Sequence, residues 1–151
     1  MRDSPQQDGW PSTGRARQTR VMDILSSRVL LRPVNLQQTQ AFYRDVLDLG
    51  IAREFGTGEQ TGIVFFLGNG LLEVSGVRES GAPSSLVLWL QVRDVVAELE
   101  RIAARGVQAV REARQEPWGL IEAWVEDPDG TRIVLVQIPQ DHPIRRDQRG
   151  L

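Results

Sequence analysis

Apolar residues along the chain form two successive series of short runs. The first series opens with a β-type run at residues 23–34, which ends at Pro33. Residues 36–50 then have apolar side chains at helical spacing, and Asn35 and Gly50 are placed to cap the two ends of a helix. Three strand candidates follow, at residues 51–55, 61–68 and 70–77.

The second series repeats this order after a polar linker at residues 78–85. Residues 86–92 have the pattern of a strand, and residues 95–106 have one apolar helical face that follows Asp94 and ends at Gly106. Three strand candidates come next, at residues 107–113, 120–126 and 131–138. A strand–helix–strand–strand–strand unit thus occurs twice at a period of about sixty residues. This repetition predicts an α+β fold of paired βαβββ modules rather than two unrelated halves.

The repeat also sets the expected domain organisation. One domain is predicted over residues 22–139, made of a module at 22–78 and a module at 86–139. Residues 1–21 are polar and contain too little apolar surface to order themselves, so we expect a disordered extension there. Residues 140–151 are equally polar and are expected to form a flexible tail.

Composition and charge narrow the classes of function. The net charge of the 151 residues is −2, which provides no basic field for nucleic acid or an anionic membrane. No apolar run approaches the roughly 18 residues that span a bilayer. The chain has no cysteine, which excludes disulfides, cysteine nucleophiles and thiolate metal sites and is consistent with the cytoplasm.

The sequence Asp127-Pro128-Asp129-Gly130 separates the last two strand candidates. Two aspartates so close together invite a cation-binding or catalytic interpretation. The turn interpretation is stronger, because Pro at the second position and Gly at the fourth fit a type I turn. In such a turn the aspartate side chains accept hydrogen bonds from the local backbone.

Two motifs within this pattern are those of a known superfamily. The sequence "AFYRDVLDLG" in the first helix and "VEDPDGTRIVLV" in the last hairpin resemble the vicinal oxygen chelate superfamily. This superfamily includes glyoxalase I, extradiol dioxygenases, and bleomycin- and fosfomycin-resistance proteins. The resemblance covers residues 22–139 and implies that the two modules form a curved, eight-stranded open barrel around a cavity. Because fold does not fix function, the activity has to come from the site.

Metal-dependent members of the superfamily place one ligand on each of four strands, usually His or Gln, Glu, His and Glu. The matching positions here are Arg28, Glu73, Val87 and Val134. An arginine and two valines do not bind a divalent cation, and only Glu73 keeps the ligand type. The single histidine, His142, lies in the expected tail. We therefore expect no metal and no cofactor, and no glyoxalase or dioxygenase activity that depends on a metal.

If these four positions face the cavity, strand alternation brings further side chains to the same side. They are Leu30, Arg32, Leu71, Ser75, Trp89, Gln91, Arg132 and Val136. The predicted cavity is thus mostly apolar with a few polar groups, as small-molecule sites are. The candidate ligand-binding residues are Arg28, Arg32, Glu73, Trp89 and Gln91.

Arg28 and Glu73 are further predicted to form an ion pair in place of the metal. Loss of Arg28 would then destabilise the fold by a few kcal/mol.

Each candidate also has a purely structural interpretation. Arg28 and Glu73 can lie in solvent, Arg32 and Gln91 at a rim, and Trp89 in the core. Trp118, in a loop, suits a lid or a contact with a partner chain. Trp124 and Glu122 share one face of their strand, although the pattern does not say which. Glu112 and Glu116 are expected on a solvated edge.

Three functions remain from this pattern. The favoured one is a metal-free binding protein that holds a small, partly apolar molecule, by analogy with antibiotic-binding members of the superfamily, and we expect a homodimer. The alternative is a metal-independent enzyme that uses Glu73 as general base and Arg28 as anion stabiliser. The third is a scaffold whose pocket is closed by side chains.

Overall fold

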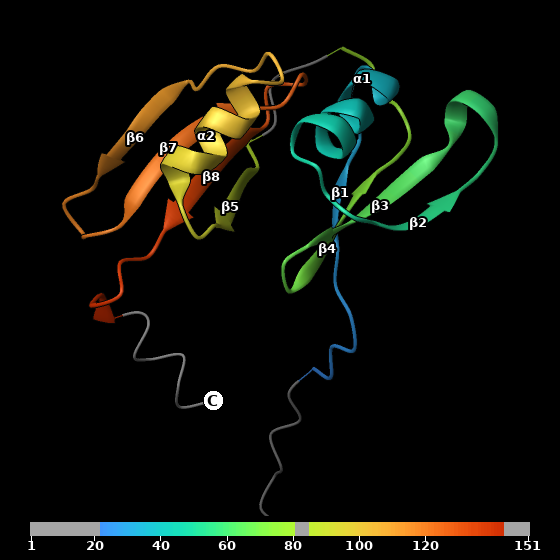
Figure 1. Ribbon diagram of the computed structural model, residues 1–151. Coiled ribbons are helices and arrows are strands. Elements are labelled where there is room, and N and C mark those ends of the chain that lie inside the picture. The colour runs from blue at the N-terminus through green and yellow to red at the C-terminus, as the bar shows by residue number, and fades with distance from the viewer. Residues whose placement is uncertain (1–21, 81–84, 144–151) are drawn as a thin grey trace, which may run out of the picture.

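The computed structural model describes residues 22–80 and 85–143 of the chain. The expectations for residues 1–21 and for residues 144–151 lie outside these ranges. The first module contains four strands and a short helix that continues into a helical turn (Figure 1). They are β1 (Val29–Leu31), α1 (Leu36–Ala41), η1 (Phe42–Val46), β2 (Ile51–Phe55), η2 (Gly58–Gln60), β3 (Gly62–Leu67) and β4 (Gly70–Val74).

The second module repeats this arrangement with a longer helix. Its elements are β5 (Val87–Gln91), α2 (Val95–Ala103), β6 (Arg111–Gln115), β7 (Ile121–Glu126) and β8 (Arg132–Gln137). The sheets have the strand orders β1-β4-β3-β2 and β5-β8-β7-β6. In each sheet the first strand pairs parallel to the last, and the remaining pairs are antiparallel. The predicted α+β fold of two βαβββ modules is therefore confirmed, as two four-stranded sheets that do not close into a barrel within one chain.

The ends of the helices follow the predicted caps with one exception. Asn35 and Asp94 each accept a hydrogen bond from the backbone N–H three residues later, as N-cap residues do. Residues 36–50 do not form one regular helix, because the chain widens into a π-helical turn at 42–46. The residue with positive φ after this turn is Asp48, at 59°, and not Gly50.

Two strands differ in length or position from the prediction. The first strand is much shorter than the predicted residues 23–34, and β6 starts at Arg111 rather than at residue 107.

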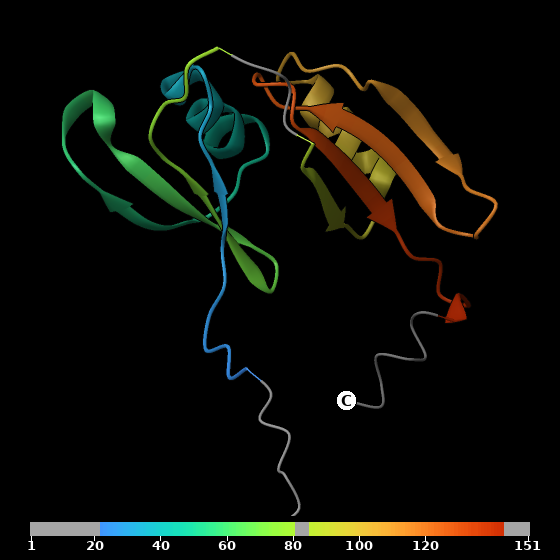
Figure 2. The ribbon, with the colours of Figure 1, turned by 180° about the vertical axis from the view of Figure 1, so that it is seen from behind.

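One apolar core joins the two modules. It includes Phe42, Tyr43 and Phe65 of the first module and Ile133 and Leu135 of the second, all buried. The strand residues among them lie on the helix-covered face of each sheet, since alternate residues of a strand point to opposite faces. Figures 1 and 2 show α1 and α2 each against one face of its own sheet. The helices therefore leave the opposite face of each sheet uncovered.

The two family motifs meet at the junction of the modules. The Tyr43 hydroxyl donates to Asp127 Oδ2 at 2.8 Å, and both residues are buried. Asp127 Oδ1 accepts from the backbone N–H of Asp129 and of Thr131, which confirms the predicted turn. Asp129 in turn accepts from the backbone N–H of Val34. The "FYRDVL" and "DPDG" motifs thus hold the modules together, which is why they mark the fold and not an activity.

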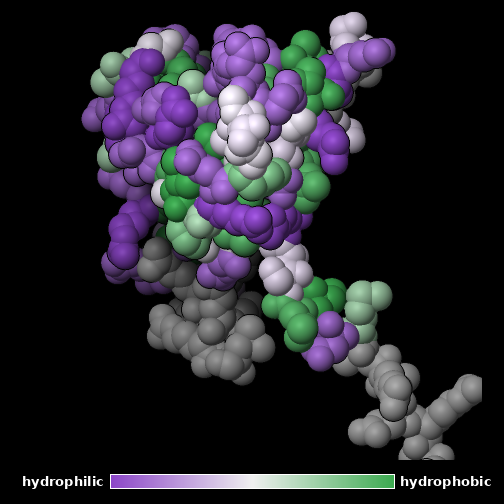
Figure 3. Space-filling view, turned by 90° about the vertical axis from the view of Figure 1, so that its right-hand side faces the viewer, coloured by the Kyte–Doolittle hydropathy of each residue, from purple (hydrophilic) through white to green (hydrophobic). Residues whose placement is uncertain are grey.

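We call the helix-free face of each sheet its open face. Large apolar side chains on these faces are about half exposed: Leu30 at 49%, Phe66 at 57%, Val87 at 51% and Trp89 at 50%. Seen from the side of the first module, hydrophobic residues lie among hydrophilic ones on the surface (Figure 3). Among the described residues, no helix has the length and hydropathy to cross a bilayer. Within residues 22–80 and 85–143, these four side chains on the open faces are thus only partly covered.

Candidate functional site

The open face of the first sheet carries the charged residues predicted for the site. Strand register places Leu30 beside Glu73, and Glu73 beside Val64. Arg28 lies just before β1, and its Nη1 donates to Glu73 Oε2 at 2.9 Å. The Ser75 hydroxyl donates to the other carboxylate oxygen, Oε1, at 2.7 Å. The predicted pairing of Arg28 with Glu73 is thus confirmed, and both oxygens of the carboxylate are occupied.

These contacts determine the charge state of Glu73. The pKa of Glu73 lies below its usual value, because the hydrogen bond from Ser75 outweighs the opposing effect of burial and the Arg28 guanidinium adds to it. A carboxylate that is stabilised in its ionised form and has both oxygens occupied is a weak general base. The geometry therefore weighs against the enzymatic role considered for Glu73.

Replacing Arg28 with alanine is expected to lower the free energy of unfolding by about 1 kcal/mol, less than a buried pair would lose, because the Arg28 side chain is 36% exposed. The loss should shrink on acidification, since a lowered pKa gives stability that disappears as the pH falls through it. Chemical denaturation at several pH values measures both effects. Arg44→Ala, which breaks the exposed pair with Asp45, is the matched control and should change stability by less than about 0.5 kcal/mol. A loss that grows on acidification would contradict this account.

The open face of the second sheet is aromatic. Register places Trp89 beside Val134, Val134 beside Trp124, and Trp124 beside Arg111. Trp89 is half exposed, so the interpretation of Trp89 as core filling is wrong. Gln91 pairs across the sheet with Val136 and is exposed. The register also settles the face of Trp124, which is the open one.

A cluster that the sequence did not reveal surrounds Trp124. The guanidinium of Arg111 lies over the indole ring at 4.0 Å from its centroid, and that of Arg132 at 4.6 Å. Trp118 Nε1 donates to Glu122 Oε1 at 2.9 Å, so the loop tryptophan closes over the same face. We call Arg111, Trp118, Glu122, Trp124 and Arg132 the tryptophan cluster. The two-residue periodicity of β7 indicated that Glu122 and Trp124 share a face, but it did not indicate which residues of other strands lie beside them.

The edge of this cluster differs from the sequence prediction. Glu116, expected on a solvated edge, is buried and receives the guanidiniums of Arg111 and Arg114. Two arginines neutralise its charge, which is what permits the burial. His142, expected in a flexible tail, instead contacts the carbonyl oxygen of Trp118 through Nε2 at 2.8 Å. The loop that carries Trp118 is therefore anchored by the segment after β8.

The four positions that the resemblance matches to metal ligands divide between the two sheets. Arg28 and Glu73 belong to the first open face, whereas Val87 and Val134 belong to the second. Within residues 22–80 and 85–143, no group of three or more His, Cys, Asp or Glu side chains is arranged to hold a metal ion. An arginine and two valines at three of these four positions do not fit a divalent cation.

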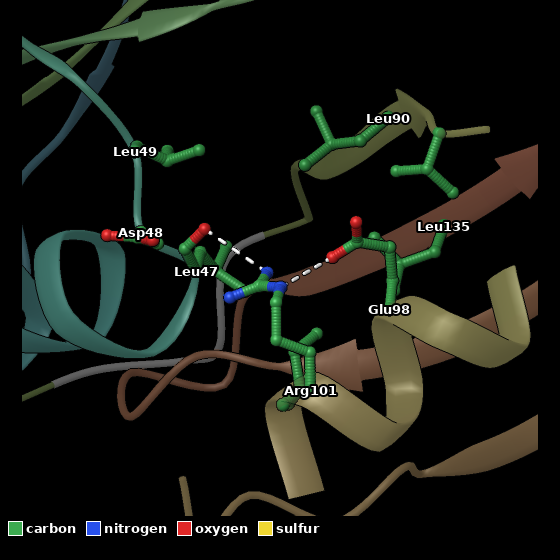
Figure 4. A pocket seen from close by; sticks show the side chains of 9 residues that line it. Leu47, Asp48, Leu49, Leu90, Glu98, Arg101 and Leu135 are labelled. Carbon is green, nitrogen blue, oxygen red and sulfur yellow. Dashed lines mark hydrogen bonds and ion pairs between the residues drawn. The ribbon is translucent and has the colours of Figure 1, made fainter. Parts of the chain in front are cut away.

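Two cavities lie at the junction of the modules. The first, of about 330 Å³, is lined by Leu49, Leu90, Leu135 and the polar residues in Figure 4. Arg101 fills one side of it, donating to Glu98 at 2.8 Å and to the carbonyl oxygens of Val46 and Leu47. Arg101 thereby caps the end of η1. We assign this cavity to packing between the modules.

The second cavity, of about 400 Å³, lies beside the turn that carries Asp127 and Asp129. Asp129 is paired with Arg78 at 2.9 Å. Leu30 and Arg32, both from the first open face, also line this cavity, so the face continues into it. The structure thus brings Arg28, Arg32 and Glu73 together, and it places Trp89 and Gln91 on the other sheet.

Comparison with known proteins agrees with the two-module architecture. A family model described as "Glyoxalase/Bleomycin resistance protein/Dioxygenase superfamily" matches residues 26–135. A search of curated proteins finds no match to this chain.

Solved structures resemble this chain at low sequence identity. TnmS3, an antibiotic binding protein from Streptomyces sp. CB03234, is 20% identical, with a TM-score of 0.66 over 80% of this chain and 100% of that one. A superfamily member from Sphaerobacter thermophilus is 18% identical, with a TM-score of 0.63 over 78% and 99%. A lactoylglutathione lyase from Agrobacterium tumefaciens is 18% identical, with a TM-score of 0.58 over 81% and 96%. At such identities these likenesses show the fold alone.

Proposed function

This chain belongs to the glyoxalase/bleomycin resistance protein/dioxygenase superfamily, and from that premise we propose that it is a metal-free binding protein for a small, partly apolar molecule. The observation that carries the proposal is the pair of open faces. They expose Trp89 and Val87 on one sheet, and Leu30 beside the Arg28–Glu73 pair on the other. Exposed aromatic and aliphatic surface with a few fixed polar groups is the usual composition of a ligand site. That TnmS3 is described as antibiotic binding supports the same function.

We further propose that the site is completed in a homodimer. Arg28, Arg32 and Glu73 lie on the first open face, and Trp89 and Gln91 on the second, so one chain presents the candidate residues on two separate sheets. A second copy would cover both faces if its second sheet faced the first sheet of its partner. Exposed apolar side chains on both faces favour such a contact, because a monomer would leave them in water.

The geometry does not support the alternative function, an enzyme with Glu73 as general base and Arg28 as anion stabiliser. Arg28 faces Glu73 and forms an ion pair with it, and the pKa of Glu73 is lowered. A base poised for proton abstraction near neutral pH would need the opposite shift. Binding without chemistry is therefore the function that these residues support best.

Native mass spectrometry of protein purified from its own host tests the proposal, with elemental analysis of the same sample. We expect the mass of a dimer, a retained small molecule, and no stoichiometric divalent metal. The Trp89→Ala variant should lose the retained molecule while its far-ultraviolet circular dichroism stays unchanged, since the Trp89 side chain is half exposed. Val96→Ala, an exposed change on helix α2, is the control. A stoichiometric divalent metal in the native protein would overturn the metal-free assignment.

A further inference from the structure

The first open face has more positive than negative groups. Arg28, Arg32 and Arg53 belong to this face, together with the carboxylate of Glu73. Glu73 is already paired with Arg28, and Arg32 is close enough to help lower the pKa of Glu73. Within the described residues, neither Arg32 nor Arg53 forms an ion pair. Two guanidiniums are thus available for an external acidic group.

Three donors on the second open face have no acceptor among the described residues. In the tryptophan cluster, Nε of Arg111, Nε1 of Trp124 and Nε of Arg132 are buried and have no hydrogen-bond partner among the described residues. A buried donor without an acceptor costs about 1–3 kcal/mol. All three unsatisfied atoms are donors, so the group that would satisfy them is an acceptor such as a carboxylate or carbonyl oxygen.

From these two observations we infer that the molecule bound at the open faces is an organic anion: an apolar, aromatic body with an acidic group held by Arg32. The inference rests on the proposed function and specifies its class of ligand. The apolar body follows from the exposed Trp89 and Phe66, which offer area for burial but no charge. The acidic group follows from the unpaired guanidiniums, which bind carboxylate, sulfonate or phosphate in a bidentate fork.

The charge of the whole protein does not account for such a preference. The chain carries a net charge of −2, so an anion is not attracted to it in general. Selectivity for an anion would have to come from local arginines. Removing an arginine elsewhere changes the net charge by the same amount as removing Arg32. A variant of that kind therefore separates the local effect of Arg32 from non-specific attraction of an anion.

Two fluorescent probes that share one aromatic body test the inference: anilinonaphthalene sulfonate, an anion, and phenylnaphthylamine, its neutral counterpart. The purified full-length protein is titrated with each probe, and the same titrations are made with Arg32→Gln and with Arg44→Gln as the charge-matched control. Arg44 pairs with Asp45 on the helical turn, away from the open faces.

We expect Arg32→Gln to weaken binding of the anionic probe about five- to tenfold and to change binding of the neutral probe less than about twofold. Arg44→Gln should alter neither. Added salt should reduce the difference between the probes, since Arg32 is exposed.

The outcomes separate the two proposals. Equal effects of Arg32→Gln on both probes, or an equal effect of Arg44→Gln on the anion, would overturn the anionic class and leave a small-molecule binding protein in place. A protein that binds neither probe would contradict the proposed binding function itself. Circular dichroism of each variant identifies a loss of affinity that comes from unfolding.

Discussion

Asp127→Ala is expected to lower the free energy of unfolding by about 4 kcal/mol, the largest effect of any single substitution considered for this protein. The Asp127 carboxylate accepts hydrogen bonds from the Tyr43 hydroxyl and from the backbone N–H of Asp129 and Thr131, at 2.8–2.9 Å. Alanine leaves a buried hydroxyl and a buried backbone N–H without acceptors, and it loosens the turn at the junction of the modules. Urea denaturation followed by tryptophan fluorescence measures the loss.

The control for this substitution is Asp45→Ala, which removes an exposed carboxylate and should leave the free energy of unfolding nearly unchanged. A second variant, Tyr43→Phe, removes one of the three hydrogen bonds and should cost about 1–2 kcal/mol. If Asp127→Ala were no more destabilising than Tyr43→Phe, the backbone contacts of Asp127 would not contribute to the stability of the turn.

Asp127 also predicts a dependence of stability on pH. Burial raises the pKa of Asp127 above its usual value, despite the hydrogen bonds that favour the ionised form. A raised pKa means that the folded protein takes up a proton more readily than the unfolded chain, so stability is gained as the pH falls through that pKa. The stability of the native protein relative to Asp127→Asn should therefore increase on acidification. A difference that stays constant between neutral and acidic pH would contradict the raised pKa.

The second large effect is a gain of metal binding on restoring the missing ligands. The triple variant Arg28→His, Val87→His and Val134→Glu, with the native Glu73, would hold two imidazoles and two carboxylates. If the open faces of two protomers meet, these groups converge and bind Zn²⁺ or Ni²⁺ with a dissociation constant of the order of micromolar. The three side chains replaced are all at least partly exposed, so the fold should tolerate the change. Isothermal titration calorimetry measures the affinity.

The fourth ligand provides the control for this variant. Adding Glu73→Gln to the triple variant should weaken metal binding at least about tenfold, because a carboxylate ligand is lost. Binding should also depend on protein concentration, since the ligands from two chains are needed. A folded, dimeric triple variant that binds no metal would show that the two open faces do not meet in the proposed way.

The sequence predicted the fold because its strongest signals are local. Period-two alternation placed Leu30 with Glu73 and Trp89 with Val134 on common faces, and the register confirms both. Asn35 and Asp94 capped helices as predicted because an N-cap acts on the backbone only three residues away. The π-helical turn after Ala41 was not predicted, because apolar spacing in a short segment does not separate a hydrogen bond spanning five residues from one spanning four.

The candidate site was predicted only in part, for a related reason. The Arg28–Glu73 pair followed from a family position, but the surroundings of Trp124 depend on which residues of β6 and β8 lie beside it. Such neighbours are set by register, which one sequence does not give. Glu116 shows the same limit. Its burial results from two arginines that come together only when β6 and the following loop are folded.

The contact between Tyr43 and Asp127 also has a consequence for the order of events at the ribosome. The two residues are separated by 84 positions, and at a translation rate of about 5–20 residues per second the acceptor is synthesised roughly 4–17 s after the donor. During that interval the nascent first module has its tyrosine hydroxyl without an acceptor and its core face without the second sheet. The nascent first module is therefore expected to expose apolar core surface until the last hairpin emerges.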